Sequence, residues 1–209
     1  AIMEGGVQVN VDGERFHDES RGYSEAAAEV LAQPGGVAWT IFDRRIAAIC
    51  RQFEDFRNAE AQGAIIEAAT LDELAIRTRL QPSSLQQTFA QVEAVRERGA
   101  PDPFGRDFSQ VVQLAPPYCA VKATGALFHT QGGLDIDARS RVLRSNGAAF
   151  GRLFAAGGAA RGVSGPHASG YLSGNGLLTA VALGRIAGRE AAKIALAQAE
   201  ARRETHAQR

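Results

Sequence analysis

The sequence predicts an α+β fold, in which helices and short strands alternate in the first half and strands precede one long helix in the second. Three observations support this prediction. Short apolar runs typical of strands occur in both halves, two helix-capping patterns follow one another after residue 70, and a helical pattern runs from Asn175 toward the end. With 209 residues, 45% of them hydrophobic, the chain can bury a core as one large or two small domains.

The sequence of the N-terminal region predicts two strands, a helix and a further strand, in that order. The stretch VQVNVDGERF alternates apolar and polar residues around Asp12 and Gly13, a dipeptide that favours a hairpin turn, so we expect strands on both sides of it. Ser24 is expected to cap a helix that ends at the Pro-Gly-Gly of residues 34–36. The apolar run VAWTIF that follows is typical of a buried strand.

Two capped helices are expected next. Thr70 with Glu73 forms a capping box before LDELAIRTRL, and Ser84 with Gln87 opens a second helix. The turn-rich stretch GAPDPFGRDF, residues 99–108, then indicates an internal boundary.

The second half of the chain is richer in glycine and in strand-like runs. These runs are CAVKATGALF, GLDID, RVLR and RLFAAG, and the long helix begins near Asn175. On this helix Gly184, Gly188 and Ala192 lie four residues apart and therefore share one face, which another backbone can approach closely. The polar residues 201–209 are expected to form a frayed tail.

Charge and cysteine content argue against several classes of protein. Lys+Arg and Asp+Glu both number 23, so no net basic field attracts nucleic acid or an anionic membrane. No apolar run predicts a membrane span and no signal peptide is visible, so we expect a cytoplasmic protein. Cys50 and Cys119 stand alone in the sequence, which fits neither a disulfide framework nor a metal site. We expect both to be buried apolar residues, and we expect no bound metal.

The motifs of the second half occur in an order that resembles a known family. The runs APPYCAVKATGALFHTQGGLDIDARSRVL and GRLFAAGGAARGVSGPHASGYLSGNGLLTAVALGRIAGREAA resemble the C-terminal third of flavoproteins in the fumarate reductase/succinate dehydrogenase family. Upstream, VNVDGERFHDES, AWTIFD, TLDELA and DPFGRDF resemble that family's capping domain. The resemblance covers nearly all of residues 5 to 195.

The resemblance implies a domain organisation. The expected parts are an FAD-domain-side strand and linker at 1–14, a capping domain for the substrate at 15–110, the returning β-rich part of the FAD-binding domain with its long helix at 111–200, and the tail at 201–209. The family's G-x-G-x-x-G turn, which receives the FAD pyrophosphate, has no counterpart in this sequence. We therefore expect a C-terminal fragment whose partner is the missing N-terminal FAD-binding half, and which by itself binds no FAD and is inactive.

The resemblance also implies which residues contact the substrate. His129 matches the histidine of the family's H-T-x-G-G stretch, and the family's proton-donating and substrate-clamping arginines align with Tyr23 and Tyr171. Because tyrosine cannot supply the charged, bidentate guanidinium that holds a dicarboxylate, classical fumarate reduction is not expected. The two tyrosines are closer to the 3-ketosteroid dehydrogenase and tricarballylate dehydrogenase branch, in which a phenol polarises a carbonyl or removes a proton beside it.

Two glycine-rich stretches resemble the elements that lie against the cofactor. LFAAGGAARG resembles a strand-to-loop element in which the family's glutamate is replaced by glycine, and SGNGLL resembles the turn whose helix N-terminus faces the flavin. The candidate cofactor residues are Gly157, Gly158, Gly174, Asn175, Gly176 and Leu177.

The resemblance thus implies a fragment of an FAD-dependent oxidoreductase. It would transfer a hydride between the flavin and a carbon–carbon bond next to a carbonyl or carboxylate of a small-molecule substrate. Two alternatives remain open. In the first, Arg21 replaces the missing guanidinium and the activity is of the tricarballylate or fumarate type. In the second, the chain is a non-catalytic fragment, or one subunit of a split flavoprotein that cannot bind FAD by itself.

Overall fold

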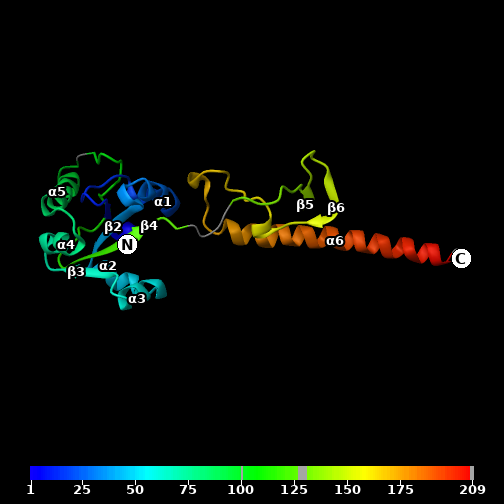
Figure 1. Cartoon of the computed structure of the whole chain (residues 1–209), viewed down its shortest axis with the longest axis horizontal. Helices are drawn as coiled ribbons and strands as arrows, with labels where there is room; N and C mark the ends of the chain where they lie inside the picture. The colour runs from blue at the N-terminus through cyan, green and yellow to red at the C-terminus, as the bar shows by residue number, and fades with distance from the viewer. Residues whose placement is uncertain (100, 127–130, 208–209) are drawn as a thin grey trace. The chain divides into compact units, whose positions relative to one another are not determined.

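The computed structural model describes residues 1–99, 101–126 and 131–207. The chain divides into two compact units, Ala1–Ala126 and Leu127–Arg209 (Figure 1). Each unit contains both helices and strands, so the predicted α+β class is confirmed.

The first unit is built on a four-stranded antiparallel sheet with the strand order β1-β2-β4-β3. Its strands are β1 (Val7–Val9), β2 (Val37–Asp43), β3 (Ile65–Ala68) and β4 (Tyr118–Thr124). The apolar run expected to be a buried strand is the central strand β2, which pairs with β4 along its whole length. This part of the prediction is confirmed.

Helices cover both faces of this sheet (Figure 1). They are α1 (Tyr23–Leu31), α2 (Arg44–Cys50), α3 (Glu54–Ala61), α4 (Leu71–Thr78) and α5 (Pro82–Arg98), with short 3₁₀ turns η1 (Ile2–Glu4), η2 (Glu19–Arg21) and η3 (Pro34–Gly36). Ile41 of β2 packs with α4 and α5 in one core cluster, whereas its neighbour Phe42 packs with α2 and α3 in another. Successive residues of a strand point to opposite faces, so the two clusters lie on opposite sides of the sheet. Cys50 and Cys119 are buried free thiols in the second cluster, as expected.

The helix starts follow local capping chemistry. Thr70 Oγ1 accepts a hydrogen bond from the Glu73 N–H at 3.1 Å and Glu73 Oε2 accepts one from the Ala69 N–H at 2.9 Å, which confirms the capping box before α4. Helix α5 begins at Pro82 rather than after Ser84, because proline fits the first turn of a helix. Helix α1 likewise begins one residue before Ser24, with Gly22 as its N-cap.

The prediction of a strand after Gly13 is wrong. Residues 14–18 form no strand, and Asn10 Oδ1 instead accepts hydrogen bonds from the N–H groups of Asp12 and Glu14 at 3.0 and 3.1 Å. Strand β1 pairs with β2 rather than with its neighbour in sequence. The alternating pattern of this segment arises because polar side chains, those of His17 and Glu19 among them, are buried by specific partners.

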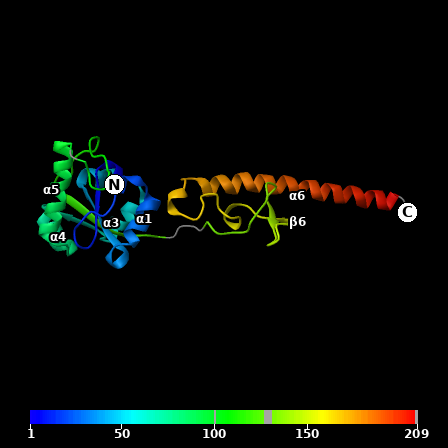
Figure 2. The same ribbon diagram turned by 90° about the horizontal axis from the view of Figure 1, so that it is seen from above.

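The second unit consists of a hairpin that packs against a long helix through Leu183 (Figure 2). Its elements are β5 (Arg141–Leu143), β6 (Ala149–Phe154), α6 (Asn175–Ala207) and the 3₁₀ turns η4 (Gly157–Ala159) and η5 (Ala168–Gly170). The stretch GLDID forms only isolated bridges, Leu134 with Ala160 and Ile136 with Val142. Residues 201–207 continue α6, so the expectation of a frayed tail at 201–209 is wrong for these residues.

The boundary between the compact units falls at Ala126, not at the turn-rich residues 99–108 that the sequence indicates as a boundary. Strand β1, expected on the side of the FAD domain, pairs with β2, and β4 lies between β2 and β3 in the same sheet. The chain therefore returns to the first unit after the turn-rich residues 99–108 and leaves it at Ala126. No local pattern indicates this return, because it depends on strand pairing between distant segments.

Candidate functional site

The glycine-rich elements of the second unit meet near the start of α6. Gly157 has φ +55°, and a Cβ added to it would lie 3.2 Å from Ala180 Cβ of α6. Glycine therefore suits the close approach of η4 to the helix. At Gly158 an added Cβ would meet no described atom within 4 Å, so this position faces open space as far as the described residues show.

The start of α6 offers hydrogen-bond donors that the rest of the described chain does not use. Gly174, with φ +83°, turns the chain into the helix, and the buried Asn175 anchors this turn by donating from Nδ2 to Ser164 Oγ. The N–H groups of Gly176 and Leu177 have no hydrogen-bond partner among the described residues. They lie at the positive end of the dipole of a 33-residue helix, where an electron-rich group is stabilised.

This arrangement fits the flavin part of FAD. An electron-rich ring edge can accept hydrogen bonds from the free N–H groups, and the open Gly158 leaves room for a flat ring. Leu177 and Leu178 next to these donors are 78% and 68% exposed, which supplies apolar surface of the kind that a ring system covers.

The substrate candidates lie in both units. His129 falls outside the described residues. Tyr171 is the C-cap residue that follows η5, lies shortly before the Gly174–Leu177 turn, and is half-buried. Arg21 ends η2 and Tyr23 begins α1 with 66% exposure, so these two lie close together on an exposed segment of the first unit.

A buried group of four charged residues lies beside that segment, and sequence reasoning missed it. We call Arg15, Glu19, Asp102 and Arg106 the charge cluster; their side chains are at most 6% exposed. The carboxylate of Glu19 accepts from Arg15 Nη2 at 2.8 Å and from Arg106 Nη1 at 3.1 Å, and Arg15 Nη1 donates to Asp102 at 2.6 Å.

The charge cluster ties three distant segments together. Arg106 also donates to the carbonyl oxygens of Gly6 at 2.8 Å and Ile2 at 2.9 Å, and its guanidinium lies 4.5 Å from the ring centre of Phe108. Because Glu19 belongs to η2, these contacts fix the backbone from which Arg21 and Tyr23 project. The motifs RFHDES and DPFGRDF contain all four residues, but only the tertiary structure shows that they pair.

Charge pairing outweighs desolvation in this cluster. Burial alone would raise the pKa of Glu19, but the hydrogen bond and charge of Arg15 and the charge of Arg106 hold that pKa below its ordinary value. The pKa of Asp102 is lowered in the same way, against its own burial, by the hydrogen bond from Arg15. Both carboxylates are therefore ionised at neutral pH.

A neutral hydrogen-bond chain holds the other side of the same loop. His17 is buried, and its Nε2 donates to Gln8 Oε1 at 2.8 Å, while Gln8 Nε2 donates to Thr40 Oγ1 at 3.1 Å. Burial lowers the pKa of His17, which keeps the imidazole neutral. Its contacts are those of a structural histidine.

The described residues show neither a metal centre nor a membrane-spanning helix. No three His, Cys, Asp or Glu side chains among them are grouped so that they could hold a metal ion. None of the helices in the described part of the chain is both long and apolar enough to cross a membrane.

Comparisons with known proteins agree with the geometry. A family model described as an FAD binding domain matches residues 1–177. The chain is 33% identical over 192 residues to a probable fumarate reductase, Ifc3, of Shewanella frigidimarina, covering 92% of this chain and 32% of that protein. It is 34% identical over 191 residues to an NADH:acrylate oxidoreductase of Vibrio harveyi, covering 90% of this chain and 18% of that protein. The chain thus spans a third or less of the length of these relatives.

Solved structures show a similar fold. The open conformation of a flavocytochrome c3 fumarate reductase matches with a TM-score of 0.67 at 33% identity, over 91% of this chain and 33% of that one. A 3-ketosteroid Δ1-dehydrogenase from Sterolibacterium denitrificans matches with a TM-score of 0.63 at 22% identity, over 88% of this chain and 39% of that one, which is a likeness of fold.

Proposed function

Since the chain belongs to the FAD binding domain family, we propose that it is part of an FAD-dependent oxidoreductase acting on a carbon–carbon bond next to a carbonyl or carboxylate. The flavin supplies the hydride chemistry when it is bound. The observation that carries the proposal is the pair of free N–H donors at Gly176 and Leu177, about one helical turn before Ala180, which Gly157 of η4 approaches closely.

The residues of this chain would supply binding and proton transfer. The turn at Gly174–Leu177 and the start of η4 hold the flavin edge and stabilise negative charge on it. Tyr171, which precedes that turn, polarises the substrate oxygen. Tyr23 moves the proton, and His129 binds the substrate. The remaining contacts to FAD, including those to its pyrophosphate, belong to an N-terminal half that we propose as the partner of this chain.

The names of the relatives are consistent with this substrate class. Fumarate and acrylate, named for the two relatives above, carry a carbon–carbon double bond next to a carboxylate. A 3-oxosteroid 1-dehydrogenase of Mycobacterium tuberculosis, 27% identical over 184 residues, is named for a carbonyl compound. Because, by the resemblance, tyrosines stand at the positions of the family's proton-donating and substrate-clamping arginines, we favour a carbonyl-activated substrate for this chain.

One observation supports a carboxylate substrate as a second candidate. The guanidinium of Arg21 forms no hydrogen bond or ion pair with a described residue, and it is exposed two residues before Tyr23. It is therefore available to a substrate anion. In that case the activity is of the tricarballylate or fumarate type.

A stopped-flow assay of the complete flavoprotein separates these outcomes. We expect the reduced flavin to be reoxidised faster by an α,β-unsaturated ketone than by fumarate at equal concentration. Faster reoxidation by fumarate would overturn the carbonyl assignment in favour of Arg21. Failure of both compounds, with FAD bound, would overturn the proposed function itself.

We expect His129→Ala to lower kcat/KM by roughly ten- to a thousandfold, about 1.4–4 kcal/mol of transition-state stabilisation. FAD content and Tm should stay nearly unchanged, because the residue is proposed to contact substrate and not the core. His206→Ala on exposed α6 is the matched control and should change none of these values. A His129 variant that loses flavin or unfolds would show that the histidine is structural.

A further inference from the structure

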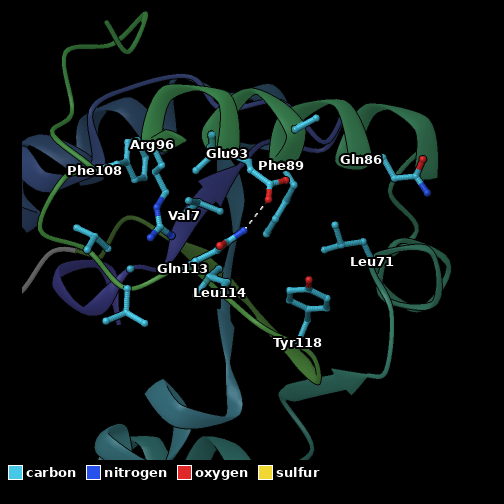
Figure 3. A pocket seen from close by; sticks show the side chains of 15 residues that line it. Val7, Leu71, Gln86, Phe89, Glu93, Arg96, Phe108, Gln113, Leu114 and Tyr118 are labelled. Atoms are coloured by element: carbon cyan, nitrogen blue, oxygen red, sulfur yellow. Dashed lines mark hydrogen bonds between the residues drawn. The ribbon is translucent and has the colours of Figure 1, made fainter. Parts of the chain in front are cut away.

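The first unit contains a cavity of about 210 Å³ that the proposed flavin chemistry does not use. It lies between α5 and the segment 111–114, above β1 and the start of β4 (Figure 3). Its apolar walls include Val7, Leu71, Phe89, Phe108 and Leu114. Drug-sized ligands occupy roughly 300–1,000 Å³, so this cavity suits a smaller molecule.

Two polar groups in this cavity lack partners among the described residues. The guanidinium of Arg96, on α5, forms no hydrogen bond or ion pair with any of them. The hydroxyl of Tyr118, at the start of β4, forms no hydrogen bond with any of them either. Figure 3 shows both side chains reaching the cavity from these different elements. The Tyr118 ring meets Phe89 edge-on, with ring centres 5.9 Å apart, and so forms part of an apolar wall.

The charges in the cavity are unevenly placed. Glu93 also lines it, and one of its carboxylate oxygens accepts a hydrogen bond from Gln113 Nε2 at 2.9 Å. Burial and the negative charges of Glu93 and Asp43 raise the pKa of Tyr118, so its hydroxyl stays protonated. A ligand carboxylate is therefore repelled by Glu93 and attracted by Arg96, whose charge is permanent.

We propose that this cavity binds a small monocarboxylate with an apolar ring or branched body. Arg96 holds the carboxylate, and the body packs against Val7, Phe89 and Leu114. The negative charge of Glu93 disfavours a second carboxylate on the same molecule. This site involves residues of the first unit alone and is independent of the flavin chemistry.

Isothermal titration calorimetry of the 209-residue chain tests this proposal with cyclohexanecarboxylate as the probe. For a ligand of this size we expect a Kd on the order of 0.1–1 mM. Cyclohexanecarboxamide, which lacks the charge, and cyclohexane-1,4-dicarboxylate should each bind about tenfold more weakly or worse. The bound probe should also raise Tm, because it binds only the folded chain.

Variants of two arginines decide where the carboxylate lies. Arg96→Gln should weaken binding of cyclohexanecarboxylate by about tenfold or more, since a charge-assisted hydrogen bond is lost. Arg79→Gln removes the same charge from an exposed position of the same unit outside the cavity and should leave the affinity unchanged. Three results would each overturn the proposal: equal affinity for the acid and the amide, an Arg96→Gln variant that binds the acid as tightly as the unchanged chain, or no binding at all at about 10 mM probe. A concentration of roughly 10 mM is the weakest Kd expected for so small a ligand in a specific site.

Discussion

Replacing Arg106 by methionine is expected to lower the free energy of unfolding of the first unit by about 3–5 kcal/mol. The substitution keeps much of the side-chain volume but removes the hydrogen bonds to Glu19, Gly6 and Ile2. Glu19 then remains buried with only part of its charge compensated. Urea unfolding followed by the fluorescence of Trp39, the single tryptophan of the chain and a core residue of this unit, measures the loss.

The matched control is an ion pair at the surface. Arg51 donates to the carboxylate of Glu60 at 2.6 Å, but both side chains are substantially exposed. Arg51→Met should therefore cause a much smaller loss than Arg106→Met, since solvated ion pairs contribute little. Equal losses in the two variants would show that the charge cluster does not hold the fold together.

The same cluster predicts how stability depends on pH. The pKa values of Glu19 and Asp102 are lower in the folded chain than in the unfolded chain, whose values are near 4.5 and 3.8. Their contribution is therefore fully present above about pH 5 and is lost as the pH falls through the folded values. Glu19→Gln should be less stable at pH 7, and its stability should fall less steeply on acidification.

Tyr23→Phe is expected to lower kcat/KM of the complete flavoprotein by about 10²–10⁴-fold, the range typical of a lost general acid or base. The side chain is 66% exposed at the start of α1, so Tm and FAD content should hardly change. The neighbouring substitution Arg21→Gln should also lower kcat/KM, but by a factor that is at least about ten times smaller. A larger loss for Arg21→Gln would contradict the role of Tyr23 and favour a carboxylate substrate held by arginine.

Local sequence patterns predicted the elements whose cause is local. The capping box at Thr70, the buried strand β2 and the start of α6 at Asn175 each depend on a few neighbouring residues, and the structure confirms them. The strand expected after Gly13 was wrong because alternating polarity there reflects buried charges and not a sheet face. Strand pairing of distant segments placed the boundary of the units at Ala126.

The candidate site was predicted through motifs, and its supporting contacts were not. The turn at Gly174–Leu177 could be found because helix starts rich in glycine carry a recognisable pattern. The charge cluster joins residues 15–19 to residues 102–106, and no spacing in the sequence indicates which charges meet. The cluster fixes the segment that carries Arg21 and Tyr23, and this support could not be predicted from the sequence. The substrate roles of these two residues stay predictions. The role of His129 stays a prediction.

We propose that η4 and the start of α6 face the flavin, and the FAD content of two tryptophan variants is the decisive test of this claim. At both Gly158 and Gly151 an added Cβ would meet no described atom within 4 Å, so a large side chain should be tolerated by the fold at either position. Absorbance of the purified complete flavoprotein in the flavin band gives the FAD bound per chain. We predict that Gly158→Trp loses most of its FAD while Gly151→Trp, on β6, keeps it. Full FAD content in both variants, with unchanged Tm, would contradict the claim.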